Sequence, residues 1–118
     1  MSHESLRELK WGLVASQPDV DTTFNVTTTA QAAMTPNPNR VQATVFNPTA
    51  NPVVARWNDD PTTSAGDPVP ENGGFLRYTY EMDGERIFGT LKLISTANST
   101  VRITSDRIPA PPPPRKVA

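Results

Sequence analysis

The chain of 118 residues contains 13 prolines, and this proline content constrains the fold more than any other feature of the sequence. Proline fixes one backbone angle and removes a hydrogen-bond donor, so a long helix or an uninterrupted central strand rarely contains it. Three Asn-Pro pairs follow one another at Asn37-Pro38, Asn47-Pro48 and Asn51-Pro52. Together with a hydrophobic content of only 36%, this spacing predicts one β-rich domain with many turns.

Alternating segments lie between these prolines. In "RVQATVF" (40–46), Val41, Ala43 and Val45 share one face, as expected for a strand. The segment "VVARW" (53–57) repeats the pattern with Val53, Ala55 and Trp57. The Asn-Pro pairs between the two segments are typical turn residues. The sequence therefore predicts a β-hairpin from residue 40 to residue 57.

A second hairpin is predicted from "FLRYTYEMDGERIFGTLKLIS" (75–95). One strand face would carry Leu76, Tyr78, Tyr80 and Met82. Asp83-Gly84 is a strong signal for a two-residue turn, because such a turn needs a positive φ. The return strand, from about Arg86 to Ser95, would include Ile87, Gly89, Leu91 and Leu93, and a last strand, "STVRITS", would point Val101 and Ile103 inward.

The segment before these hairpins reads as a polar linker at 18–23, followed by one long strand, "FNVTTTAQAAM" (24–34). The count of six or seven strands predicts an all-β fold, a single β-sandwich or small barrel of jelly-roll-like type. We expect three parts: an N-terminal helix or arm at 1–21, the β-domain at 22–108 and a proline-rich tail at 109–118.

Both ends of the chain are candidates for binding a partner. Leu6, Leu9 and Leu13 fall on one face of a possible short helix, which would fold back on its own domain or act as an arm that docks on a neighbouring subunit. The tail "IPAPPPPRKVA" is expected to be an extended polyproline segment. The candidate partner-binding residues are Leu6, Leu9, Trp11, Leu13, Pro111, Pro112, Pro113 and Pro114.

Composition argues against several functions. The chain has no cysteine, one histidine (His3) and a formal net charge of -1, with acidic and basic residues well mixed. Thiolate metal sites, disulfides and cysteine nucleophiles are therefore excluded, and no basic stripe is present for nucleic acid. The sequence has no signal-peptide pattern and no 18-residue apolar stretch. We expect a soluble protein with no cofactor, no metal, no nucleic acid and no membrane among its ligands.

The loop 58–74 carries four carboxylates: Asp59, Asp60, Asp67 and Glu71. Clustered oxygen ligands suit calcium, but this spacing matches no EF-hand, and a solvated loop is the expected alternative. An enzyme would need a pair of carboxylates close together, and Asp59 or Asp60 with Glu71 is the only candidate pair in the sequence. We expect no enzymatic activity.

From about Arg40 to Ser105, the order of elements resembles small virion proteins of tailed bacteriophages. Their pattern is an Arg-apolar strand ending in Asn ("RVQATVFN"), a second short strand, a Gly-x-Pro-apolar turn (Gly66–Val69) and a Gly-rich step ("NGG", 72–74). A strand pair and a closing strand, "ANSTVRIT", complete it.

The resemblance implies a β-sandwich that decorates or cements a capsid, or that belongs to the tail, fibre or head–tail junction. It implies no catalytic residues. Expected partners are the major capsid protein or other virion proteins, and the expected location is the virion, assembled in the host cytoplasm. Symmetric homo-oligomers are the default for such proteins, and we expect a trimer.

A carbohydrate-binding β-sandwich module is the alternative from a different class. In that case, aromatic side chains would form a stacking platform for sugar rings, unless they are needed in the core. The candidate residues for this platform are Trp57, Phe75, Tyr78 and Tyr80.

Overall fold

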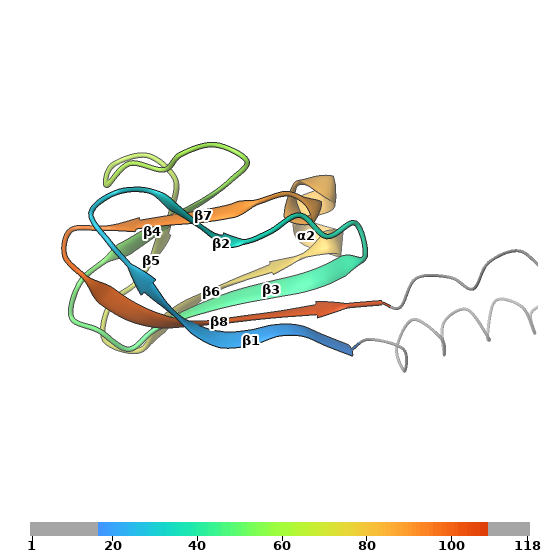
Figure 1. Cartoon of the computed structure of the whole chain (residues 1–118), viewed down its shortest axis with the longest axis horizontal. Helices are drawn as coiled ribbons and strands as arrows, with labels where there is room; N and C mark the ends of the chain where they lie inside the picture. The colour runs from blue at the N-terminus through green and yellow to red at the C-terminus, as the bar shows by residue number, and fades with distance from the viewer. Residues whose placement is uncertain (1–16, 109–118) are drawn as a thin grey trace, which may run out of the picture.

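A computed structural model describes residues 17–108 and contains two antiparallel sheets of four strands each (Figure 1). The first sheet has the order β1 (Gln17–Val26), β8 (Ser99–Arg107), β3 (Arg40–Asn47) and β6 (Gly74–Thr79). The second sheet has the order β2 (Gln31–Met34), β7 (Leu91–Ser95), β4 (Val53–Trp57) and β5 (Asp67–Val69). A short helix, α2 (Tyr80–Asp83), and a 3₁₀ turn, η1 (Gly84–Phe88), connect β6 to β7. The expected all-β fold is confirmed.

Strands distant in sequence pair with one another. The antiparallel pairs are β1 with β8, β2 with β7, β3 with β6 and β4 with β5. The first half of the domain thus runs alongside the second half in reverse order. Further pairing of β3 with β8 and of β4 with β7 joins these pairs into the two sheets.

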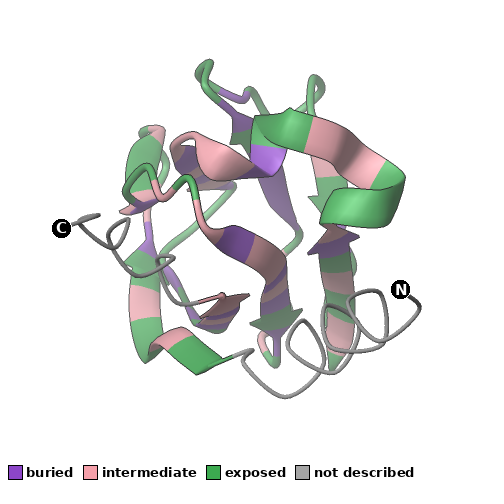
Figure 2. Cartoon of the chain, turned by 90° about the vertical axis from the view of Figure 1, so that its right-hand side faces the viewer, coloured by how far each residue is buried: buried purple, intermediate pink, exposed green. Residues whose placement is uncertain are grey.

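The hydrophobic core lies between the sheets, where alternate residues of each strand meet (Figure 2). Val41 is half-buried, while the other inward residues expected for the first segments, Ala43, Val45, Val53, Ala55 and Trp57, are buried. The predicted inward positions Leu91, Leu93, Val101 and Ile103 are also buried. The period-two pattern therefore located the inner faces of these strands correctly, but the return strand begins at Leu91 and not at about Arg86, because Ile87 lies in η1.

The hairpin expected at 40–57 is wrong, because β3 and β4 belong to different sheets. The five residues between them carry the chain from one sheet to the other. Asn47 stabilises this crossing: its Nδ2 donates to the Asn51 carbonyl at 2.7 Å, and its Oδ1 accepts from the Thr49 amide at 3.0 Å. The Asn-Pro pairs do make a bend, but the bend joins two sheets and not two neighbouring strands.

The hairpin expected at 75–95 is wrong for a similar reason, since β6 ends at Thr79 and β7 lies in the second sheet. Thr79 caps α2: its Oγ1 accepts from the Met82 amide, and its own amide donates to Asp83 Oδ2 at 2.9 Å. Gly84 has the expected positive φ, 71°, but as the residue that ends α2. Tyr80 and Met82 are exposed, whereas Leu76 and Tyr78 face the core as expected.

Two expectations before residue 35 are also corrected. The linker expected at 18–23 is part of β1, and the single strand expected at 24–34 is divided between β1 and β2. A turn at Thr27 makes the division, because its Oγ1 accepts from the Thr29 amide and its carbonyl accepts from the Ser95 amide. The boundary expected at residue 21 therefore falls inside a strand, and residues 67–69 of the expected loop 58–74 form β5.

Candidate functional site

An aromatic pair lies on the outer face of the first sheet. Phe46 of β3 and Phe75 of β6 are directly opposite each other in the register. Their chain neighbours Val45 and Leu76 point toward the core, so alternation turns both rings outward. Phe46 is 39% exposed and Phe75 is 62% exposed. Exposed aromatic side chains that gather on one sheet face are a candidate surface for a partner.

Arginines flank this pair. Arg102 of β8 is opposite Phe46 on its other side, and Arg77 of β6 is two residues from Phe75. Arg102 Nη2 lies 2.6 Å from Asp21 Oδ1, and Arg77 Nη2 donates to Gln42 Oε1 at 2.6 Å. These contacts hold both guanidinium groups on the sheet. Aromatic residues and arginine are the types enriched at protein interfaces, so we call Phe46, Phe75, Arg77 and Arg102 the aromatic face.

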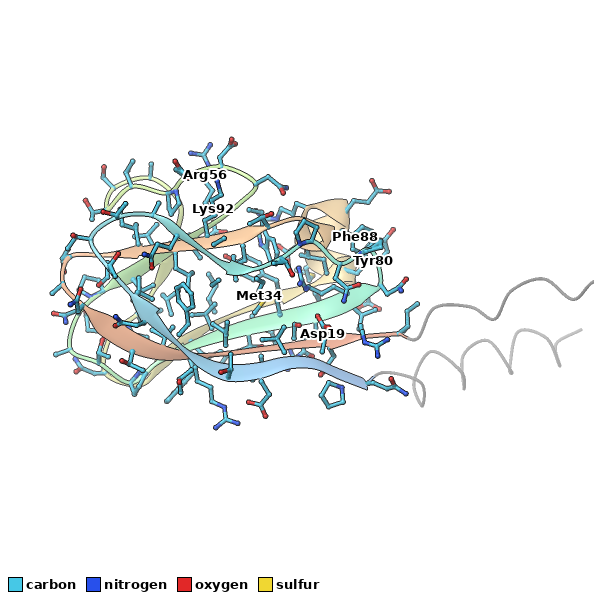
Figure 3. The ribbon with its side chains drawn as sticks, viewed as in Figure 1. Asp19, Met34, Arg56, Tyr80, Phe88 and Lys92 are labelled. Atoms are coloured by element: carbon cyan, nitrogen blue, oxygen red, sulfur yellow. The ribbon has the colours of Figure 1, made fainter. Side chains whose placement is uncertain are left out.

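The outer face of the second sheet is charged and partly covered. Arg56 of β4 and Lys92 of β7 are opposite each other and are exposed or half-buried (Figure 3). Arg56 pairs with Asp59 at 3.7 Å, and Lys92 pairs with Asp60 at 3.0 Å. The loop after β4 folds onto this sheet, since Pro61 is buried. The two outer faces therefore differ in chemistry.

Arg40 is a charged residue in the interior, 1% exposed. Its guanidinium donates to the carbonyls of Thr35, Ile87 and Gly89 at 2.7 to 3.1 Å. Burial lowers the pKa of Arg40 from its ordinary value, and Asp19, 3.7 Å away, opposes that change. Arg40 connects the β2–β3 loop with η1 and with Gly89, the residue that follows η1, which is a structural role.

A second polar cluster lies between β5, β6 and η1. Tyr78 Oη donates to Asp67 Oδ2 at 2.9 Å, and Arg86 lies 5.5 Å from the Tyr78 ring. Arg86 also pairs with Asp83 at 2.6 Å and with Asp67 at 3.7 Å. Burial, followed by the hydrogen bond to Asp67, raises the pKa of the Tyr78 hydroxyl above its ordinary value. Each charged group in this cluster has a partner, so the cluster stabilises the fold.

The four aromatic residues considered for a sugar platform do not come together. Trp57 and Tyr78 are buried and pack edge to face in the core, with ring centroids 5.2 Å apart. Phe75 and Tyr80 are exposed, but they lie at opposite ends of β6. Two of the four residues, Trp57 and Tyr78, are therefore core residues and are not available to bind a sugar.

The four carboxylates of the loop are also separated by their partners. Asp59 and Asp60 pair with basic residues of the second sheet, and Asp67 binds Tyr78, whereas Glu71 is exposed. Within residues 17–108, no group of three or more His, Asp or Glu side chains is arranged to hold a metal ion. The same residues contain no helix long and apolar enough to cross a membrane.

The candidate partner-binding residues at both chain ends, Leu6, Leu9, Trp11, Leu13 and Pro111–Pro114, lie outside the described residues. The aromatic face was not anticipated from the sequence. The alternation of residues along a strand places Phe46 and Phe75 on the face that points away from the core. This pattern was the one feature of the sequence from which their exposure could have been predicted. Comparisons of the chain with protein-family models, with curated proteins and with solved structures gave no match.

Proposed function

We propose that the chain is a structural virion protein of a tailed bacteriophage, a capsid decoration or cement protein that binds between major capsid subunits. The observation that carries the proposal is the aromatic face, in which Phe46 and Phe75 lie side by side between Arg77 and Arg102. Such a face suits burial against another protein. The proposal includes no catalytic activity, no cofactor, no nucleic acid and no membrane.

The proposed fold is a jelly-roll-like β-sandwich. The pairing of β1 with β8, β2 with β7, β3 with β6 and β4 with β5 supports it, because a long hairpin wound into two sheets has this pairing. Jelly rolls occur in viral capsid domains and in lectins. The fold alone does not select a function, so the aromatic face carries the argument.

The phage-like sequence pattern also agrees with the strands. "RVQATVFN" is β3, and the closing segment "ANSTVRIT" contains the first part of β8. The Gly66–Val69 segment, expected as a turn, instead contains β5, while the "NGG" step leads into β6, with positive φ at Asn72 and Gly73. We propose a homo-oligomer, a trimer, that binds repeated sites on the particle so that modest contacts add up to strong attachment.

The experiment mixes the purified full-length chain with particles of the virus that encodes it, after the chain has been stripped from them. Light scattering first gives its mass in solution. Cosedimentation then measures how many copies rebind. We expect stoichiometric rebinding by the unchanged chain. The double variant Phe46→Ser, Phe75→Ser should bind at least about tenfold more weakly, because this is the effect expected when one or more buried hot-spot residues are lost.

Met82→Ser is the matched control, because Met82 is apolar and 84% exposed but lies on α2, away from the aromatic face. It should rebind like the unchanged chain. No rebinding by the unchanged chain would overturn the decoration role and favour the tail, fibre or head–tail junction. Equal rebinding by the double variant would remove the aromatic face from the proposal.

A further inference from the structure

An open hollow of about 460 Å³ lies between the start of β3 and α2, and Val41, Gln42, Thr79, Tyr80 and Glu81 line it. The ring of Tyr80 stacks on Phe88, with centroids 5.4 Å apart and planes 12° apart. Tyr80 is 48% exposed, although its ring is already ordered by this stacking. Figure 3 shows both rings at the end of the molecule where β8 ends. The hollow thus has an aromatic wall that faces solvent.

The described part of the chain ends close to this hollow. The amide of Ile108 donates to the Asn39 carbonyl at 2.9 Å, two residues before Val41. Across the first sheet, Asp106 pairs with Gln42 and Gln42 pairs with Thr79. Because neighbouring strands are about 4.8 Å apart, the line from β8 to Thr79 is only about 10 Å long. Ten residues, "PAPPPPRKVA", follow Ile108.

These ten residues are long enough to reach the aromatic wall. A polyproline segment advances about 3.1 Å per residue, so residues 109–112 alone span about 12 Å and residues 109–114 span about 19 Å. Pro111–Pro114 can therefore lie beside Tyr80 while Ile108 keeps its bond to Asn39. No rearrangement of the described strands is required.

The chemistry of the hollow matches that of the tail. Polyproline segments bind in grooves lined by aromatic rings, where proline rings pack against the aromatic faces. Glu81 lines the hollow and Glu85 follows four residues later in η1; both are exposed, and the ion pairs within residues 17–108 involve neither. The nearby cations already have partners, since Arg86 pairs with Asp83 and Arg77 donates to Gln42. The tail supplies two cations, Arg115 and Lys116, directly after its prolines.

We propose that residues 109–116 dock in the hollow of their own chain. Pro111–Pro114 pack against Tyr80 and Phe88, and Arg115 and Lys116 lie beside Glu81 and Glu85. The docked tail covers the exposed aromatic wall and fixes the direction in which the chain leaves the domain. This inference does not depend on the proposed virion role, because it concerns a contact within one chain.

The absence of cysteine from the chain allows a direct test. Ala118→Cys in the full-length chain places a single nitroxide label two residues after Lys116, and amide NMR then reports which residues it approaches. Amides at 41–42 and 79–85 should broaden, whereas those at 49–51 and 72–73, just beyond the far ends of β3 and β6, should not. A mixture of isotope-labelled chain without nitroxide and unlabelled chain with nitroxide should show no broadening.

Two variants test the two parts of the contact. Tyr80→Ala removes the exposed aromatic wall, and Glu81→Lys reverses one charge while keeping the rings, so each should remove most of the broadening. Phe75→Ala is the matched control, since it deletes an exposed ring outside the hollow and should leave the broadening unchanged. Absence of broadening at 41–42 and 79–85, equal broadening in all variants, or broadening found only in the mixed sample would overturn the proposal.

Discussion

Arg40 shows how a single charged residue can hold several segments of a small β-domain together. Three backbone carbonyls from different segments converge on its guanidinium, and Trp57 lies 5.7 Å from it on one side. A buried cation is tolerated because these acceptors and Asp19 replace most of the water that it has lost, while its Nε has no acceptor within residues 17–108. The cost of removing it is therefore set by the acceptors that remain.

Replacing Arg40 with methionine should strongly destabilise the domain. Three carbonyls lose their donor and Asp19 loses one of its cationic partners, and removal of one member of a buried ion pair costs about 3 kcal/mol or more. Urea unfolding followed by circular dichroism measures the change. Arg56→Met, which removes an exposed arginine 3.7 Å from Asp59, should cost less than about 1 kcal/mol. Similar losses for the two variants would contradict the role assigned to Arg40.

Tyr78 gives the domain a predictable response to alkaline pH. Burial and the bond to Asp67 raise its pKa in the folded state above the ordinary value of 10.0. The unfolded chain therefore loses this proton first as the pH rises. The contribution to stability is fully present below pH 10.0 and is lost progressively above it.

The free energy of unfolding should accordingly decrease above pH 10.0, with Tyr78 adding about 1.4 kcal/mol per pH unit to the slope. Tyr78→Phe should lower stability near neutral pH by about 1 kcal/mol, the net value of a lost hydrogen bond. It should also show a shallower decrease above pH 10.0, because that proton is gone. Urea unfolding of both chains at a series of pH values gives the two slopes, and parallel curves would exclude the effect.

At the scale of elements, the sequence predicted where the strands lie better than it predicted which strands pair with each other. The period-two pattern placed the inner faces of β3, β4, β7 and β8 correctly, because each strand buries one face. Turn residues mark a bend, but they do not determine whether the chain stays in its sheet or crosses to the other. Both predicted hairpins failed on this point.

For the candidate site too, the sequence predicts what happens within a strand but not how strands pair. Alternation alone turns Phe46 and Phe75 away from the core, so their exposure could be predicted from the sequence. Their pairing could not, because Phe46 and Phe75 are 29 residues apart in the sequence and meet only through the register between β3 and β6. The short helix α2 was missed although Thr79 and Asp83 are typical cap and first-turn residues before Gly84.

Gly84, which follows α2 and begins η1, is the position between these two elements at which a replacement is most informative. Its backbone, at φ 71° and ψ -155°, is in a region that is open almost only to glycine, while a β-carbon there would contact nothing within 4 Å. Gly84→Val should therefore lower the unfolding free energy by about 1–3 kcal/mol through backbone strain alone. Glu85→Val, at the next and exposed position, should change it by less than about 0.5 kcal/mol. Equal urea midpoints for the two variants would mean that residue 84 does not hold this conformation.

At the scale of the whole domain, three of the four sheet edges, β1, β2 and β5, carry features that protect against pairing with other chains. The second sheet ends in two short strands, β2 and β5, and β5 contains Pro68. The long edge strand β1 carries Pro18, Asp19 and Asp21. Prolines and charges on edge strands are common protections against edge-to-edge association. These three edges are therefore poorly suited to pairing with a strand of another chain.

The start of the domain is fixed by Asp19. Its Oδ2 accepts from Ser105 Oγ at 3.0 Å and lies 3.7 Å from Arg40 Nη2, and its Oδ1 lies 4.0 Å from Arg107 Nε. Deleting residues 1–20 would remove Asp19 and four residues of β1, whereas deleting residues 1–16 would retain both. In the chain that lacks residues 1–20, Arg40 would therefore stay buried without the Asp19 carboxylate. In the chain that lacks residues 1–16, it would keep this carboxylate.

We therefore expect the chain lacking 1–20 to be less stable than the chain lacking 1–16 by at least about 2 kcal/mol, measured by urea unfolding. Asp19→Asn in the full-length chain isolates the charge, because it keeps the length of β1 and a similar side-chain shape. It should reproduce much of the difference. If the two truncated chains unfold at the same urea concentration, residues 17–20 add nothing to the domain, and its first strand begins after residue 20.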